Sequence, residues 1–267
     1  MVSQALTIAG SDSGGGAGIQ ADLKAFSALG VYGASVITAI TAQNTRAVTA
    51  VEPITPANIR AQMDAVLDDL NIGAIKIGML GGPEAITAVA EGLATQTIPL
   101  VLDPVMIAKS GDALLPDEAI STLRDHILPL ATVLTPNLPE AARLLGTEEA
   151  QTEEDMANQG RALMELGPKA VMMKGGHGSG PDCVDLLIEA DHTLRLTAPR
   201  RATKNTHGTG CTLSASIAAE LAKGADLPAA VTAAHAYLQG AIAAADDLHI
   251  GSGHGPVHHF HALWTNG

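Results

Sequence analysis

The chain has 267 residues, of which 46% are hydrophobic and 16% are charged, so one domain, residues 1–267, with a large core is expected. Its formal net charge of −13 and its few aromatic residues (one Trp, two Tyr, two Phe) argue against nucleic acid, which requires a basic surface and stacking side chains. No apolar run approaches the roughly 20 residues that span a bilayer, and two distant cysteines behind an N-terminus without a signal pattern predict a cytoplasmic protein.

A short strand followed by a glycine-rich loop opens the chain. The apolar run 5–9 leads into residues 10–18, which include five glycines, and helical spacing follows over 19–29. The loop lacks the Gly-Lys-Ser/Thr of a Walker motif and resembles the dinucleotide fingerprint only loosely. It still allows close backbone approach to a ligand, with Asp12 and Asp22 as hydrogen-bond acceptors. The alternative for either aspartate is a helix cap or a solvated face.

Polar amides follow the next predicted strand. Residues 35–41 are β-branched and apolar, which predicts a buried strand, and Gln43 stands just after it. Its side chain offers both a donor and an acceptor, the pattern that matches the edge of an aminopyrimidine. A solvated glutamine at a strand end is the alternative.

Strands and helices alternate through the rest of the chain. The predicted strands are 74–79, 98–102, 132–134 and 170–173, and the predicted helices are 56–70, 83–95, 116–130, 152–166, 212–223 and 227–247. Residues 182–188 and 192–196 predict a hairpin at the sheet edge. This pattern predicts an α/β fold in three layers, with an open, mainly parallel sheet and helices on both faces. The histidines of the C-terminal tail match no familiar zinc site.

Two carboxylates and a lysine follow predicted strands, where α/β sheets place their ligands. Asp103 and Glu140 could hold a hydrated Mg²⁺, which prefers one or two carboxylates together with phosphate oxygens. An acidic protein needs such local devices to bind phosphates. Lys174 could bind a phosphate directly. The alternatives are a favourable charge in a helix first turn for Glu140 and a surface position for Lys174.

The stretch Asn205-Thr-His-Gly-Thr-Gly-Cys211 reads as a loop running into a helix N-terminus. Gly208 and Gly210 permit a tight turn, and the unpaired first amides with the helix dipole favour an anion such as a transferring phosphoryl group. Cys211 in that first turn is expected to have a lowered pKa and to act as a base or nucleophile. The alternatives are a plain tight turn and a small buried thiol.

Several motifs together carry a family resemblance. They are Thr7-Ile8-Ala9-Gly10-Ser11-Asp12, Gly15-Gly16-Ala17-Gly18-Ile19-Gln20-Ala21-Asp22, Thr41-Ala42-Gln43-Asn44-Thr45, Asp103-Pro104-Val105-Met106, Thr135-Pro136-Asn137, Lys174-Gly175-Gly176-His177, the 205–211 stretch and Gly253-His254-Gly255-Pro256. Over nearly its whole length the sequence resembles the hydroxymethylpyrimidine/phosphomethylpyrimidine kinases of thiamin biosynthesis, within the ribokinase-like fold. Much of that superfamily has Asp where Cys211 stands.

The resemblance implies a mechanism and a set of site residues. ATP would bring its γ-phosphoryl group to the anion hole, and Cys211 would take the proton of the substrate hydroxyl. The implied catalytic residues are Cys211, Gly208, Thr209 and Gly210; the nucleotide contacts are Lys174, Asn137 and Thr135; the pyrimidine contacts are Gln43, Gly10, Asp22, Met79 and Val105; the Mg²⁺ ligands are Asp103 and Glu140. Both the hydroxymethyl compound and its monophosphate would be phosphorylated by a homodimer. A pyridoxal kinase and an inactive pyrimidine-binding module remain as alternatives.

Overall fold

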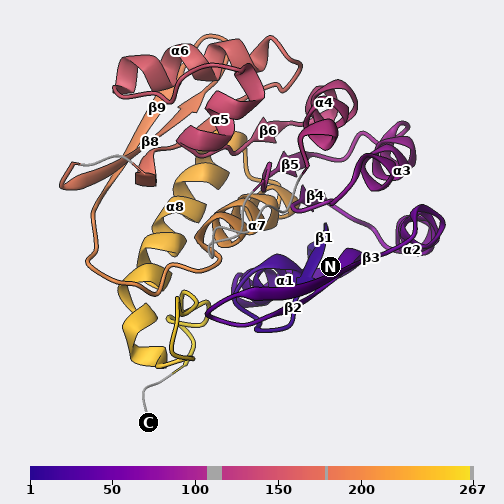
Figure 1. Ribbon diagram of the computed structural model, residues 1–267, viewed down its shortest axis with the longest axis horizontal. Coiled ribbons are helices and arrows are strands. Elements are labelled where there is room, and N and C mark those ends of the chain that lie inside the picture. The colour runs from indigo at the N-terminus through magenta and orange to yellow at the C-terminus, as the bar shows by residue number, and fades with distance from the viewer. Residues whose placement is uncertain (107–115, 178–179, 265–267) are drawn as a thin grey trace.

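The computed structural model describes residues 1–106, 116–177 and 180–264, and its strands form one nine-stranded sheet (Figure 1). The strands are β1 (Gln4–Asp12), β2 (Tyr32–Gln43), β3 (Val48–Pro53), β4 (Ala74–Ile77), β5 (Leu100–Leu102), β6 (Val133–Leu134), β7 (Val171–Lys174), β8 (Asp182–Ile188) and β9 (Thr193–Pro199). Their order is β3-β2-β1-β4-β5-β6-β7-β8-β9. Strands β2, β1, β4, β5, β6 and β7 are parallel, whereas β3, β8 and β9 pair antiparallel. The prediction of a mainly parallel sheet is confirmed.

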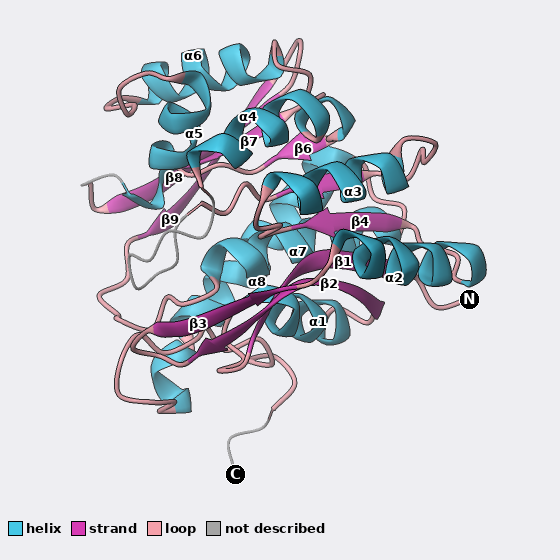
Figure 2. Cartoon of the chain, turned by 45° about the vertical axis from the view of Figure 1, so that its right-hand side comes forward, coloured by secondary structure: helices cyan, strands magenta, loops and turns pink. Residues whose placement is uncertain are grey.

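Helices cover both faces of this sheet (Figure 2). They are α1 (Gly18–Ala28), α2 (Pro56–Asp69), α3 (Pro83–Leu93), α4 (Asp117–His126), α5 (Leu138–Leu145), α6 (Glu153–Met164), α7 (Thr209–Ala222) and α8 (Leu227–Ala243). One core lies between the sheet and helices α2 to α6, and the other lies between the sheet and α1, α7 and α8. The central strands read as continuous apolar runs because they are buried on both faces. No helix in the described ranges is long and apolar enough to cross a bilayer.

The two halves of the sheet meet at β1, which pairs with β2 on one side and with β4 on the other. The chain first runs outward from β1 through β2 to β3 and then returns to build the remaining strands on the opposite side. In open α/β sheets, such a reversal of strand order leaves a crevice beyond the carboxyl ends of the strands, and ligands bind there. The topology therefore marks the carboxyl end of β1 as the place to look for a site.

Several predicted boundaries differ from the structure. The helix expected at 212–223 begins three residues earlier, at Thr209, because Gly208 adopts the left-handed conformation (φ 79°) and caps it. The stretch expected as one helix over 116–130 ends at His126 and continues as a short 3₁₀ turn, Leu128–Leu130, that contains Pro129. The strand expected to be buried, β2, is partly exposed, with Ile40 at 50%, because its outer neighbour is only the edge strand β3.

Candidate active site

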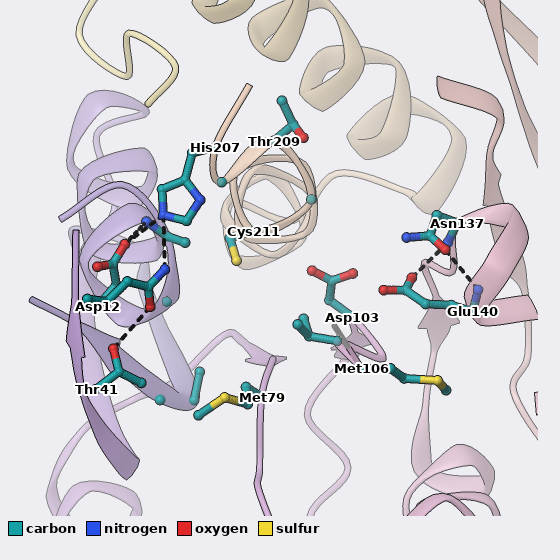
Figure 3. A pocket seen from close by; sticks show the side chains of 18 of the residues that line it. Asp12, Thr41, Met79, Asp103, Met106, Asn137, Glu140, His207, Thr209 and Cys211 are labelled. Carbon is teal, nitrogen blue, oxygen red and sulfur yellow. Dashed lines mark hydrogen bonds and ion pairs between the residues drawn. The ribbon is translucent and has the colours of Figure 1, made fainter. Parts of the chain in front are cut away.

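A cavity of about 450 Å³ lies at the carboxyl ends of the parallel strands, at the strand-order reversal. Asp12 and Gln43 reach it from the ends of β1 and β2, and Lys174 reaches it from the end of β7. The first turn of α7, which carries Thr209 and Cys211, borders it (Figure 3). This is the position that the sheet topology indicates for a ligand.

Most of the residues expected at the site do line this cavity. They are Gly10, Gln43, Met79, Asp103, Val105, Asn137, Glu140, Lys174, Gly208, Thr209, Gly210 and Cys211. Two expected residues do not line it. Thr135 is fully buried behind Asp103, whose Oδ1 it faces at 3.3 Å, and Asp22 is fully buried beneath the pocket floor.

The turn before α7 presents backbone amides to the cavity. Gly208 has the positive φ that lets the loop reverse, and the intrahelical hydrogen bonds begin with the Thr212 amide, which donates to the Gly208 carbonyl at 2.8 Å. Thr209, Gly210 and Cys211 therefore form a first turn that faces the pocket with the positive end of the helix dipole. This arrangement suits an anion, as the sequence predicts.

Cys211 points into the pocket from that turn, but its protonation state differs from the expectation (Figure 3). Burial raises the pKa of the thiol to about 11, and the negative charges of Asp22 and Asp103 act in the same direction. The charge of Lys76 and the Gly18 amide oppose this rise without reversing it. The predicted lowering of the thiol pKa is therefore wrong, because enclosure and neighbouring carboxylates outweigh the helix N-terminus.

A lysine lies between two carboxylates on the opposite wall. Lys174 Nζ is 2.8 Å from Asp103 Oδ1 and 3.8 Å from Glu140 Oε2. Asn137 and Glu140 form a capping box that starts α5, each side chain accepting the other's backbone N–H at 2.8 Å. Burial alone would lower the pKa of Lys174, but the two carboxylates raise it. Burial raises the pKa of Glu140 to about 7.

These carboxylates are hard oxygen donors of the kind that Mg²⁺ prefers. Within the described ranges, no group of three or more His, Cys, Asp or Glu side chains is arranged to hold a metal. Asp103 and Glu140 thus fit an ion that takes most of its other ligands from phosphate and water, and not an ion enclosed by protein.

A second polar cluster on the substrate side includes a residue that the sequence reasoning missed. His207 Nε2 lies 2.9 Å from Asp12 Oδ2 and 3.3 Å from the side-chain amide of Gln43. The Thr41 hydroxyl contacts the other end of that amide at 3.0 Å. The only signal for His207 was its place inside the 205–211 stretch, between the loop and the glycines.

A buried ion pair beneath the floor was also missed. Lys76 Nζ lies 3.0 and 2.8 Å from the two oxygens of Asp22, and Thr7 donates its hydroxyl to the same carboxylate at 2.6 Å. Lys76 lines the cavity from below. Its positive charge lowers the pKa of the Cys211 thiol. A lysine inside the apolar run of β4 was the available sequence signal, because lysine is seldom fully buried without a partner.

Comparisons with known proteins agree with this geometry. The family model described as phosphomethylpyrimidine kinase matches residues 12–258. A hydroxymethylpyrimidine/phosphomethylpyrimidine kinase of Rhizobium meliloti (strain 1021) is 60% identical over 266 residues, covering 100% of both chains. The crystal structure of a phosphomethylpyrimidine kinase from Clostridium difficile 630 is 45% identical and has a TM-score of 0.80, covering 91% of this chain and 100% of its own. A Bacillus subtilis pyridoxal kinase in an ADP complex is 37% identical, with a TM-score of 0.91, covering 99% of this chain and 100% of its own.

Proposed function

Because this chain belongs to the phosphomethylpyrimidine kinase family, we propose that its pocket phosphorylates 4-amino-5-hydroxymethyl-2-methylpyrimidine and then the resulting monophosphate. The protein is a kinase of thiamin biosynthesis and uses ATP. The observation that carries the proposal is the meeting of two devices in one cavity: the open first turn of α7 and the cluster formed by Lys174, Asp103 and Glu140. Both serve phosphoryl transfer and neither serves simple ring binding.

The amides of Gly208, Thr209 and Gly210 are proposed to hold the transferring phosphoryl group, with the Thr209 amide giving up its 3.4 Å hydrogen bond to the Thr206 carbonyl. Phosphoryl transfer passes through a loose transition state, so most of the catalysis is positioning and charge stabilisation. Fixed amides at a helix N-terminus supply that stabilisation without reorganising.

Cys211 is proposed to accept the proton of the substrate hydroxyl. Its thiol holds its own proton at neutral pH, since its pKa is raised to about 11, so only the thiolate fraction can act as a base. Lys76 beneath it favours the thiolate. In a loose transition state the hydroxyl loses its proton late, when bond formation to phosphorus has made it acidic, so a small thiolate fraction can suffice.

The opposite wall is proposed to receive the nucleotide phosphates. Lys174 and Asn137 would contact the phosphates, while Thr135 would act from behind by holding Asp103. Asp103 and Glu140 would hold Mg²⁺, which supplies neutralisation of phosphate charge when bound. Burial raises the pKa of Glu140 to about 7. A cation bound nearby would lower this pKa and favour the charged carboxylate.

The pyrimidine ring is proposed to lie between Gly10, Gln43, Met79 and Val105, which all line the cavity. Met79 covers Gly10 so closely that a Cβ there would overlap the methionine side chain, and Gly10 donates its N–H to the Met79 carbonyl at 3.0 Å. Asp22, which has no surface in the pocket, would act on the substrate only through Lys76.

A pyridoxal kinase is the second candidate, favoured by the close superposition on the Bacillus subtilis pyridoxal kinase. Its substrate also carries a hydroxymethyl arm on a flat ring. The deciding experiment is mass spectrometry of the products formed by the purified protein with ATP, Mg²⁺ and each substrate in parallel. Mono- and diphosphates of the hydroxymethylpyrimidine, formed at a kcat/KM about tenfold or more above that for pyridoxal, are expected. A preference for pyridoxal would support the second candidate, and no product from either would support an inactive binding module.

We further propose that the enzyme is a cytoplasmic homodimer. Both cysteines are free thiols, as a reducing compartment requires. Strand β3 lies at the sheet edge with most of its residues exposed, and Ile40 and Val51 add exposed apolar surface there. Sedimentation equilibrium tests this assembly, and a monomer at micromolar concentration would reject it.

A further inference from the structure

We propose that His207 is a positioning residue that fixes the orientation of the Gln43 amide and thereby sets the preference for an aminopyrimidine ring. The inference rests on the proposed function and adds a specificity role for a residue that touches no part of the reacting centre. It follows from the hydrogens that Asp12, His207, Gln43 and Thr41 can share. Figure 3 labels Asp12, His207 and Thr41.

Asp12 determines where the proton of His207 lies. Asp12 Oδ2 accepts the amides of Gly16 and Ala17 at 3.0 and 2.8 Å, and Oδ1 accepts the amide of Gly14 at 2.8 Å. Burial would raise the pKa of this carboxyl, but His207 and the amides lower it below its ordinary value. The carboxylate can only accept, so His207 Nε2, 2.9 Å away, must carry a hydrogen and donate it.

That hydrogen also determines what Gln43 can present to His207. The structure has Gln43 Nε2 at 3.3 Å from His207 Nε2, but an Nε2–H that donates to Asp12 has no lone pair to accept from this amide nitrogen. Exchanging the oxygen and nitrogen of this amide places the oxygen toward His207, where it shares the hydrogen that Nε2 donates to Asp12. Amide oxygen and nitrogen are assigned from their hydrogen-bond partners, and His207 favours the exchanged orientation.

The contacts of Thr41, at the other end of the amide, agree with this orientation. Its hydroxyl has one hydrogen, and the Ser11 carbonyl lies 2.8 Å away to receive it. The same hydroxyl also faces Gln43 Oε1 at 3.0 Å, and its one hydrogen cannot serve both oxygens. With the hydrogen on Ser11, Thr41 Oγ1 accepts from an amide nitrogen at this position, so the exchanged orientation satisfies both neighbours.

The backbone and the ring are held as firmly as the amide. Ser13 Oγ donates to the Gln43 carbonyl and accepts from the Gln43 amide, each at 2.8 Å, so the residue cannot slide along the strand. The His207 ring lies against Gly16, where a Cβ would overlap it, and the His207 backbone pairs with Pro256 in a β-bridge. These contacts limit where the ring can lie.

The consequence is a fixed recognition pattern in the pocket. Gln43 keeps one acceptor lone pair on the His207 side and one N–H on the Thr41 side. A ring with an amine beside a ring nitrogen matches this pair when its amine lies toward His207. Pyridoxal lacks that amine and leaves the amide oxygen unmatched, which costs affinity.

The test compares two variants that differ only in the donor at this position. His207→Phe keeps the ring against Gly16 but removes the N–H, whereas His207→Gln offers an amide N–H at a similar reach. We expect His207→Phe to raise the KM for hydroxymethylpyrimidine about tenfold, to reduce its preference over pyridoxal by a similar factor, and to leave the KM for ATP within about twofold. His207→Gln should restore most of the loss. His192→Ala, an exposed histidine on the β8–β9 hairpin, is the matched control.

The outcomes separate the inference from the proposed function. If the wild-type protein does not phosphorylate hydroxymethylpyrimidine, the proposed function fails. If it does, and His207→Phe keeps the wild-type KM and preference, the positioning role is rejected. The role is also rejected if His207→Phe lowers kcat/KM equally for both rings or raises the KM for ATP as much, because these changes would reflect a general structural loss.

Discussion

Lys76 Nζ lies 2.8 Å from Asp22 Oδ2, and neither side chain has any surface exposed to solvent. The pair crosses from β4 to α1 directly below the pocket, and Thr7 of β1 completes it. Burial opposes the charge on both groups: it raises the pKa of Asp22, whereas the attraction of Asp22 keeps the pKa of Lys76 above its ordinary value. Each charge is therefore tolerated only because the other is present.

Removing one member of this pair should destabilise the protein more than removing both. We expect Lys76→Met to lower the free energy of unfolding by about 3–5 kcal/mol, because Asp22 would remain as an unpaired buried group. The double variant Asp22→Asn with Lys76→Met should recover at least half of the loss. Urea unfolding of the wild type, the single variants Lys76→Met and Asp22→Asn, and the double variant measures the coupling; strictly additive single losses would contradict it.

The base role of Cys211 predicts a characteristic pH profile. Because the thiol pKa is about 11, the thiolate fraction and kcat/KM should rise with pH throughout the neutral and alkaline range. Cys211→Ala should lower turnover by about a hundredfold while an ATP analogue still binds. Cys211→Asp, a carboxylate already ionised at neutral pH, should remain active and lose the alkaline rise. Cys183→Ala on β8 is the control, and near-normal turnover in Cys211→Ala would leave Cys211 a packing residue.

The carboxylates and Lys174 should give separable kinetic defects. We expect Asp103→Asn and Glu140→Gln to raise the Mg²⁺ concentration needed for half-maximal rate, because each removes an anionic oxygen donor. Lys174→Ala should instead raise the KM for ATP. The exposed residues Glu165 and Lys169 supply control substitutions. Unchanged Mg²⁺ titrations in both carboxylate variants would mean that the ion is held by the nucleotide alone.

Glu140 should make the empty protein less stable as the pH rises. Its pKa is raised from 4.5 to about 7, so the folded protein keeps a proton that the unfolded chain releases in this window. The stabilising contribution of the protonated form is complete below pH 4.5 and is lost as the pH passes 7. Glu140→Gln should therefore increase the free energy of unfolding at pH 8, by at most about 3 kcal/mol, and not at pH 4.5. Thermal unfolding without Mg²⁺ or nucleotide tests this, and a less stable variant at pH 8 would reject it.

The sequence was a good guide wherever a strand carried an apolar run. The alternation of strands and helices, the edge hairpin and the convergence of Asp103, Glu140 and Lys174 all follow from the rule that parallel strands end at one edge. Strand β3 was not predicted because almost all of its residues are exposed. Its sequence therefore lacks the alternation of apolar and polar residues that indicates a half-buried strand.

What escaped prediction depended on partners distant in the sequence. The residues around Lys76 do not indicate that its partner is Asp22, 54 positions away. The residues around His207 likewise do not indicate Asp12, 195 positions away. The predicted lowering of the Cys211 pKa was wrong for the same reason. Local sequence gives Cys211 its helix N-terminus, but the enclosure and the two carboxylates that raise its pKa come from other elements.

The capping glycine of α7 touches the glycine-rich loop after β1 so closely that a Cβ at Gly208 would overlap the carbonyl oxygen of Gly16. Together with the bond between His207 and Asp12, this contact joins two loops from opposite ends of the chain into one wall of the cavity. We therefore expect the two loops to open together. Their amides should therefore exchange hydrogen with solvent at a common rate, as a single cooperative unit, and a ligand that protects the anion-binding turn should protect residues 14–17 by the same factor.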